Sequence, residues 1–62
     1  MEMGTEDYLK KALLDTQERV RDFMLYSDKI ENHGISKFFR QYALSEAEQA
    51  KHLQQYIKSV EQ

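Results

Sequence analysis

Apolar residues recur every three or four positions along two long segments of the chain, which is the spacing of one face of an α-helix. In the first segment the recurring positions are Leu9, Leu13, Thr16, Val20, Phe23, Ser27 and Ile30. In the second segment they are Phe39, Tyr42, Glu46, Gln49, Leu53, Tyr56 and Val60. Alternation with a period of two is nowhere sustained, and glutamate, glutamine, lysine and alanine are frequent. The pattern therefore predicts two helices and argues against strands.

Glycine and short polar residues mark the expected helix ends. Gly4 and Gly34 are the only glycines in the chain. We expect Thr5 to be the N-cap of the first helix, Gly34 to end that helix in a left-handed C-cap, and Ser36 to cap the second helix. The sequence thus predicts a single helical-hairpin domain over residues 1–62. Its parts are a first helix over about 5–31, a turn over 32–35 and a second helix over about 36–60.

A hairpin of this size has few means of stabilising itself alone. Ordering 62 residues costs on the order of 90 kcal/mol at about 1.5 kcal/mol per residue. The chain also has no cysteine, so disulfides are excluded. Ala43, Ala50 and Ile57 widen the second apolar stripe, which gives that helix apolar surface for two neighbours. We therefore expect an all-α, antiparallel two-helix hairpin that dimerises into a four-helix bundle.

Charge and composition exclude several classes of function. Nine basic and 11 acidic residues give a net charge of -2 without a basic block, so we expect no nucleic-acid partner. The apolar runs are too short for a membrane span or a signal-peptide core, and we expect a cytoplasmic protein. The serines are not accompanied by a histidine and an acid in a catalytic order, and glycine-rich phosphate loops are absent. We expect no catalytic residues.

Glu46 is the most informative polar residue, because it lies in the middle of the second stripe with Gln49 one turn later. A buried carboxylate is costly unless it is paired, protonated or bound to a cation. One interpretation is an ion pair with Arg19 or Arg21, or an exit through a polar gap near Thr16. A second is a polar layer that fixes register and oligomer number. A third is a metal site in which Glu46 faces its symmetry mate across the bundle.

Further potential metal ligands lie near the same level of the hairpin. Antiparallel pairing puts residues whose numbers sum to about 67 at similar heights, so His52 falls near Asp15 and Gln49 near Glu18. Glu48 precedes His52 by four residues, which places both on one helix face. Carboxylates and imidazole suit iron, manganese or zinc. The competing interpretation is a solvated pair at the stripe's edge. The candidate metal ligands are Glu46, Glu18, Glu48 and His52.

The stretch from Tyr26 to Ile57 resembles the ferritin-like superfamily, especially rubrerythrin-like chains. The likeness is carried by Lys29-Ile30-Glu31-Asn32, by Lys37-Phe38-Phe39-Arg40-Gln41-Tyr42-Ala43, and by Glu46, Ala50, Leu53 and Ile57. In that family a Glu-x-x-His pair on this segment ligates a di-iron centre. Here Glu46 holds the glutamate position, Gln49 stands in place of the histidine, and the first-helix glutamate falls near Thr16. The resemblance implies a half-length ferritin-like unit that completes its bundle by dimerising.

Together these observations favour a small homo-oligomeric helical-bundle protein of assembly or interaction type, with no cofactor and with itself as partner. The alternative is a ferritin-like, di-iron-type protein that binds iron or another divalent metal and has oxidoreductase or iron-handling activity. A third interpretation is an accessory helical module that docks on a larger protein through the same stripes.

Overall fold

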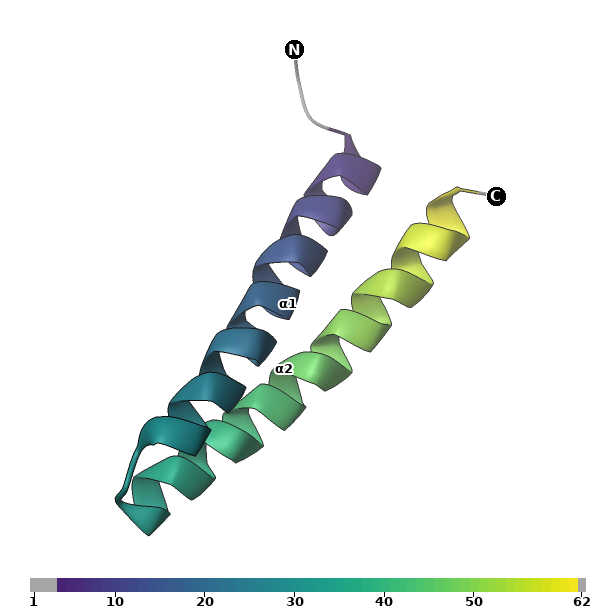
Figure 1. Ribbon diagram of the computed structural model, residues 1–62. Coiled ribbons are helices and arrows are strands. Elements are labelled where there is room, and N and C mark those ends of the chain that lie inside the picture. Colours follow the sequence, from purple (N-terminus) through teal and green to yellow (C-terminus); the bar gives the residue numbers. More distant parts are fainter. Residues whose placement is uncertain (1–3, 62) are drawn as a thin grey trace.

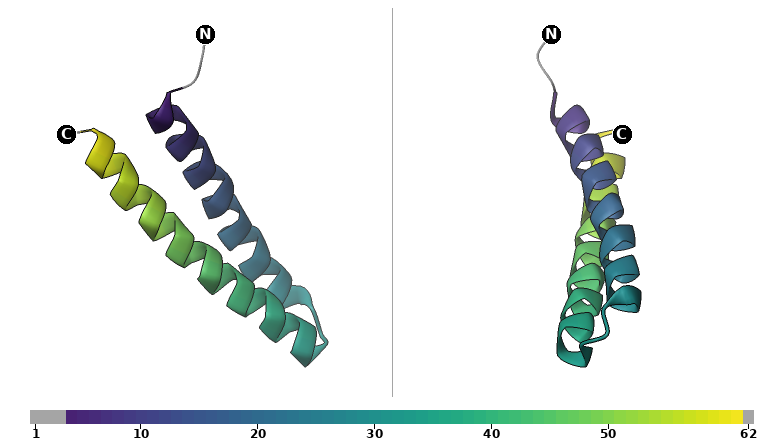
Figure 2. Two further views of the ribbon diagram at one scale, coloured as in Figure 1. Left: turned by 180° about the vertical axis from the view of Figure 1, so that it is seen from behind. Right: turned by 60° about the vertical axis from the view of Figure 1, so that its left-hand side comes forward.

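The computed structural model describes residues 4–61 as two helices joined by a short connection (Figure 1). Helix α1 covers Thr5–Lys29 and helix α2 covers His33–Val60. The chain reverses direction between them, so the helices run antiparallel (Figures 1 and 2), and they pack against each other. Residues 4–61 contain no strand. The prediction of an all-α antiparallel hairpin is confirmed.

The helices begin at different capping residues from those the sequence predicts. Before α1, the backbone N–H of Gly4 donates to the Asp7 carboxylate at 3.2 Å, and Thr5 is already the first helical residue. Before α2, the Asn32 side-chain oxygen accepts a hydrogen bond from the backbone N–H of Ile35 at 3.0 Å. Asparagine is a strong N-cap residue, and here it replaces Ser36 in that role. The predictions for Thr5 and Ser36 as N-caps are therefore wrong.

The connection between the helices does not use a left-handed residue. The backbone is extended at Ile30, with φ -79° and ψ 122°, and at Asn32, with φ -67° and ψ 116°. No residue in the described range has a positive φ, and Gly34 lies inside the first turn of α2. The predicted Gly34 C-cap is wrong, because the chain leaves α1 through extended backbone. Helix α1 ends two residues earlier than predicted and α2 begins three residues earlier.

Small side chains form the seam between the helices. Thr16 and Ser27 on α1 are 4% and 3% exposed, and Ala43 and Ala50 on α2 are 1% and 8% exposed. All seven positions of the stripe predicted for α1 are buried or half-buried, as expected. The positions of α2 that are buried or half-buried are Ser36, Phe39, Ala43, Glu46, Ala50, Leu53 and Ile57.

The stripe predicted for α2 is therefore only half right. Phe39, Glu46 and Leu53 are half-buried, whereas Tyr42, Gln49, Tyr56 and Val60 are exposed. The true centre of the packed face is rotated toward the alanines, which the sequence placed at the edge of the stripe. Small residues at the centre let the helix backbones approach closely, and the larger residues then lie on either side of the contact.

A reciprocal pair of serine hydrogen bonds joins the helices beside the turn. The Ser27 hydroxyl donates to the Ser36 carbonyl oxygen at 2.9 Å, and the Ser36 hydroxyl donates to the Ser27 carbonyl oxygen at 2.6 Å. We call this arrangement the serine clamp. The helices are close together at this end and diverge toward the chain termini (Figures 1 and 2). The clamp thus sets the register of the hairpin at its closed end.

The hairpin is a single layer of structure. Its principal extents are 45, 22 and 11 Å, and its radius of gyration of 14.4 Å exceeds the value of about 10.6 Å for a compact domain of this length. Within the described residues, no large side chain is fully buried. Stable domains pack two layers around a shared core. One hairpin supplies one of these layers.

Candidate functional site

Glu46 and Arg19 form an ion pair at mid-length, across the two helices. The Arg19 Nε–H donates to the Glu46 Oε1 atom, and the Arg19 Nη2 group also donates to the Thr16 hydroxyl oxygen at 3.3 Å. The Glu46 side chain is 16% exposed and the Arg19 side chain 45%. Of the interpretations of Glu46 from the sequence, the pair with Arg19 beside Thr16 is confirmed, and Arg21 is not the partner.

The pair also has an electrostatic signature. The hydrogen bond and the negative charge of Glu46 raise the pKa of Arg19 above its ordinary value, and they outweigh the opposing effect of desolvation. Tyr42 and Asp15 add smaller contributions in the same direction. Arginine is a cation at any ordinary pH, and a charge-assisted hydrogen bond of this type is among the stronger polar contacts in proteins.

The remaining candidate metal ligands are spread over the surface. His52 Nε2 lies 3.8 Å from Glu48 Oε1, and both side chains are more than half exposed. Glu18 and Gln49 are exposed, and the Asp15 carboxylate accepts a hydrogen bond from Lys11 at 2.9 Å. Across residues 4–61, no group of three or more histidine, aspartate or glutamate side chains is placed to hold a metal ion. A site shared between two copies stays a prediction.

Aromatic rings cluster near the closed end of the hairpin. The Phe23 ring lies 4.6 Å from the Tyr42 ring and 5.5 Å from the Phe39 ring, measured between centroids. Phe38 packs against Phe39 and Tyr42 at 5.5 and 5.9 Å with nearly perpendicular rings, and Tyr26 packs against Phe39 at 5.7 Å. Phe38 is nevertheless 57% exposed. The cluster is therefore covered on its inner side and open on its outer side.

The outer side of this cluster belongs to a longer apolar surface that we call the aromatic face. On α2 its successive residues are three, four or 14 positions apart, which are spacings that return to one side of a helix. On α1 its two tyrosines are 18 residues, or five helical turns, apart. Its members are between 42% and 64% exposed. They are Tyr8, Tyr26, Ile35, Phe38, Tyr42, Tyr56 and Val60.

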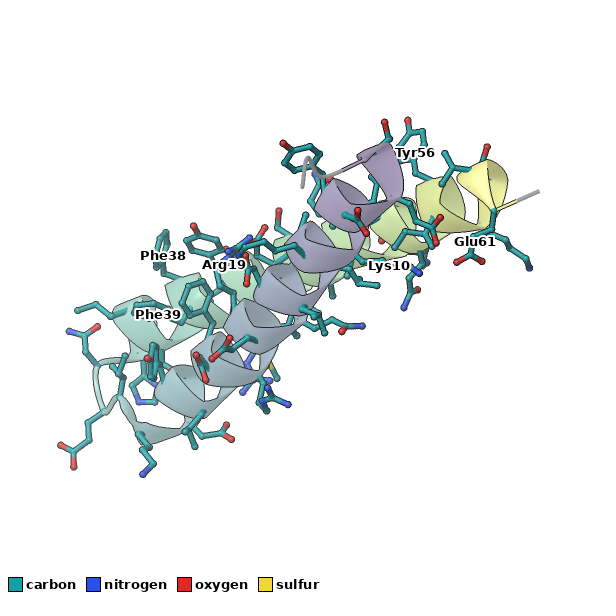
Figure 3. All side chains as sticks on the ribbon, turned by 90° about the horizontal axis from the view of Figure 1, so that it is seen from above. Lys10, Arg19, Phe38, Phe39, Tyr56 and Glu61 are labelled. Atoms are coloured by element: carbon teal, nitrogen blue, oxygen red, sulfur yellow. The ribbon has the colours of Figure 1, made fainter. Side chains whose placement is uncertain are left out.

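The Arg19–Glu46 pair lies in the middle of the aromatic face. Arg19 is seven residues, about two helical turns, before Tyr26, and it is close enough to Tyr42 for that residue to influence its pKa. Figure 3 shows Phe38, Arg19 and Tyr56 on one side of the helix pair, whereas Lys10 and Glu61 lie on the other. The face thus has apolar residues toward both ends and one ion pair at its centre.

The opposite face carries two ion pairs that join the helices. Lys10 Nζ lies 3.6 Å from Glu61 Oε1, and Arg40 Nη2 lies 3.8 Å from Asp28 Oδ1, so both pairs join α1 to α2. Between these pairs lies an open groove of about 300 Å³. The groove is lined by Gln17, Val20, Ala47, Ala50, Lys51 and Gln54. Two ion pairs and a shallow groove distinguish this face from the aromatic face.

Sequence reasoning missed the aromatic face as a separate surface. The sequence pattern places Ile35 in the turn, and Tyr42 and Tyr56 on the single wide stripe of the second helix. The signal was present, because Ile35, Phe38, Tyr42, Tyr56 and Val60 keep helical spacing among themselves. Two apolar stripes that overlap on one helix look like one wide stripe in the sequence.

In comparisons with known proteins, no family model, curated protein or solved structure matches the chain. The ferritin-like resemblance therefore rests on the residues quoted above and stays a prediction. Neither α1 nor α2 is long and apolar enough to cross a membrane.

Proposed function

We propose that this chain is a homo-oligomeric helical-bundle protein that acts in assembly or interaction and has no catalysis of its own. The observation that carries the proposal is the aromatic face. Seven large apolar side chains are at least 42% exposed there, whereas Ala43 and Ala50 are the buried apolar residues of the described hairpin. Large exposed apolar side chains gathered on one face are typical of interaction sites.

The accessible surface of the hairpin supports the same proposal. A compact protein of this mass would expose about 4,200 Å², whereas the hairpin exposes 5089 Å². The excess of roughly 900 Å² is close to the roughly 800 Å² that each partner buries in a standard stable interface. A second hairpin on the aromatic face supplies the missing layer and gives a four-helix bundle.

The test is the mass of the protein in solution, measured by sedimentation equilibrium. We expect a dimer or a higher oligomer at micromolar concentration, with a helix content by circular dichroism that falls on dilution as the oligomer dissociates. A stable, fully helical monomer over the whole concentration range contradicts the proposal.

A substitution on the aromatic face sharpens this test. We expect Phe38→Lys to raise the dissociation constant of the oligomer at least about tenfold, because it places a charge in a surface that becomes buried. Leu14→Lys is the matched control, because Leu14 is 67% exposed and lies away from the aromatic face. An equal effect of both substitutions counts against the aromatic face as the interface.

Ferritin-like metal binding is the second candidate function, and the half-buried carboxylate of Glu46 is the observation that favours it. The donor set of one hairpin does not fit a di-iron centre, because Arg19 engages Glu46 and Gln49 stands where the family has a histidine. Any such site would need a second copy. Elemental analysis of protein purified from iron-supplemented cells tests it, and a preparation without stoichiometric metal argues against it.

A further inference from the structure

We infer that the second copy docks on the aromatic face with both turns at the same end of the bundle, so that two Arg19–Glu46 pairs form one ring of alternating charge. This inference rests on the proposed function, because it requires self-association. It adds the surface that each copy uses, the direction in which the copies dock and the residues that select this direction.

The choice of surface follows from what each face would lose on burial. The aromatic face would bury seven exposed apolar side chains and one ion pair. The opposite face would bury two ion pairs, Lys10–Glu61 and Arg40–Asp28, and the Lys51 ammonium group, in exchange for the smaller apolar side chains of the groove. Desolvating charges is costly, whereas burying apolar surface is favourable. The aromatic face is therefore the interface.

The dimensions of the face are sufficient. The hairpin extends 45 Å by 22 Å in the plane of its helices, so one whole face projects an area of roughly 1,000 Å². A standard interface needs roughly 800 Å² from each partner. Most of one face must therefore be covered, from the turn to the open end.

Two copies related by a two-fold axis can cover the aromatic face in two ways. When both turns lie at the same end, α1 of one copy packs over α2 of its partner. When the turns lie at opposite ends, α1 packs over α1 and α2 over α2. Arg19 and Glu46 are close to the midpoints of Thr5–Lys29 and His33–Val60, so they meet the partner's pair in both arrangements.

The charges at the centre of the aromatic face favour one of the two arrangements. With both turns at one end, Arg19 faces the partner's Glu46 and Glu46 faces the partner's Arg19. With the turns at opposite ends, Arg19 faces the partner's Arg19 and the two carboxylates face each other. In the partly dry centre of a bundle, like charges side by side are unfavourable and alternating charges attract. The ion pair therefore orients the second copy.

Distances between spin labels test this orientation in the full-length protein. The chain has no cysteine, so one introduced cysteine gives one label per copy. His33→Cys places an exposed label at the turn, and Ser45→Cys places an exposed label near the midpoint of α2. The Ser45 label reports on any dimer through the aromatic face, and the His33 label reports on its direction.

With the turns together, both labels give distances of about 30 Å or less, the width of three helices of about 10 Å. A short distance at Ser45 with about 45 Å at His33, the length of the hairpin, overturns the orientation but leaves self-association intact. The absence of dipolar coupling at both positions overturns the dimer and the orientation together. Sedimentation of the labelled protein in the same buffer confirms its mass.

Discussion

The partner of Glu46 illustrates what the sequence determines at the scale of single residues. The helical spacing places the carboxylate toward α1 and names two candidate cations, Arg19 and Arg21. These two arginines are about 200° apart around the helix axis, so only one can lie beside a given point on α2. In the structure, the arginine that pairs with Glu46 is Arg19. The sequence could not make this choice, because it depends on the rotation of one helix against the other.

A second residue-scale contact gives a test by pH. Lys10 Nζ lies 2.7 Å from Glu6 Oε1, and its hydrogen bond and charge lower the pKa of Glu6 below the ordinary value of 4.5. The contact therefore adds stability above that pH, and this stability is lost as the pH falls through the lowered pKa. Because both groups are exposed, we expect the contribution to be small.

We expect Lys10→Ala to move the pKa of Glu6 upward toward its ordinary value, as measured by NMR titration of the side-chain carboxyl carbon. Lys11→Ala is the control, because Lys11 bonds Asp15 instead. If Lys10→Ala leaves the titration of Glu6 unchanged, the contact does not persist in solution.

At the scale of the helices, the sequence predicted the number, type and direction of the elements but not the rotation of α2 about its own axis. The seven inward positions predicted for the first helix are all buried or half-buried, six of them on α1 and Ile30 just after its end. On α2 the tyrosines and the alanines are both apolar, and a pattern of hydrophobicity does not show which of them lies at the contact. Side-chain volume decides it, since Ala43 and Ala50 allow the closer approach.

A substitution beside the turn tests where α2 begins. Gly34 lies within α2 at negative φ, and a Cβ atom there would have its nearest contact at 3.4 Å, with the Asn32 side-chain oxygen. We expect Gly34→Ala to stabilise the protein by about 0.5–1 kcal/mol, because alanine has the higher helix propensity and the smaller loss of backbone entropy.

Urea unfolding with Gly4→Ala as the control measures this effect. The control position precedes α1 and has no atom within 4 Å of an added Cβ. Destabilisation by Gly34→Ala would indicate instead the left-handed conformation that the sequence first suggested, because alanine is strained there.

At the scale of the whole molecule, the sequence indicated that one hairpin is incomplete, and the single layer of helices with its exposed aromatic face agrees with this. The direction of docking was left open, because it depends on the height of the Arg19–Glu46 pair along the hairpin. Only the folded chain shows that this pair lies at mid-length on the aromatic face.

Charge reversal tests the role of the pair in assembly. We expect Arg19→Glu to raise the dissociation constant of the dimer by about tenfold or more, because it gathers four carboxylates at the centre of the interface. The double variant Arg19→Glu with Glu46→Arg restores alternating charges and should recover most of the affinity. Lys51→Glu makes the same reversal on the opposite face and serves as the control. Equal affinities for all variants in low salt, measured by sedimentation velocity, contradict this role.

The serine clamp has a consequence for how a single copy would behave before it meets another. Its two hydroxyl bonds hold the helices together beside the turn, whereas the helices diverge toward their far ends, where the exposed Lys10–Glu61 pair joins them. The contacts of a single hairpin are therefore stronger at its closed end than at its open end. In the proposed dimer, binding of the second copy would therefore add most rigidity to the half of the molecule that contains both helix ends remote from the turn.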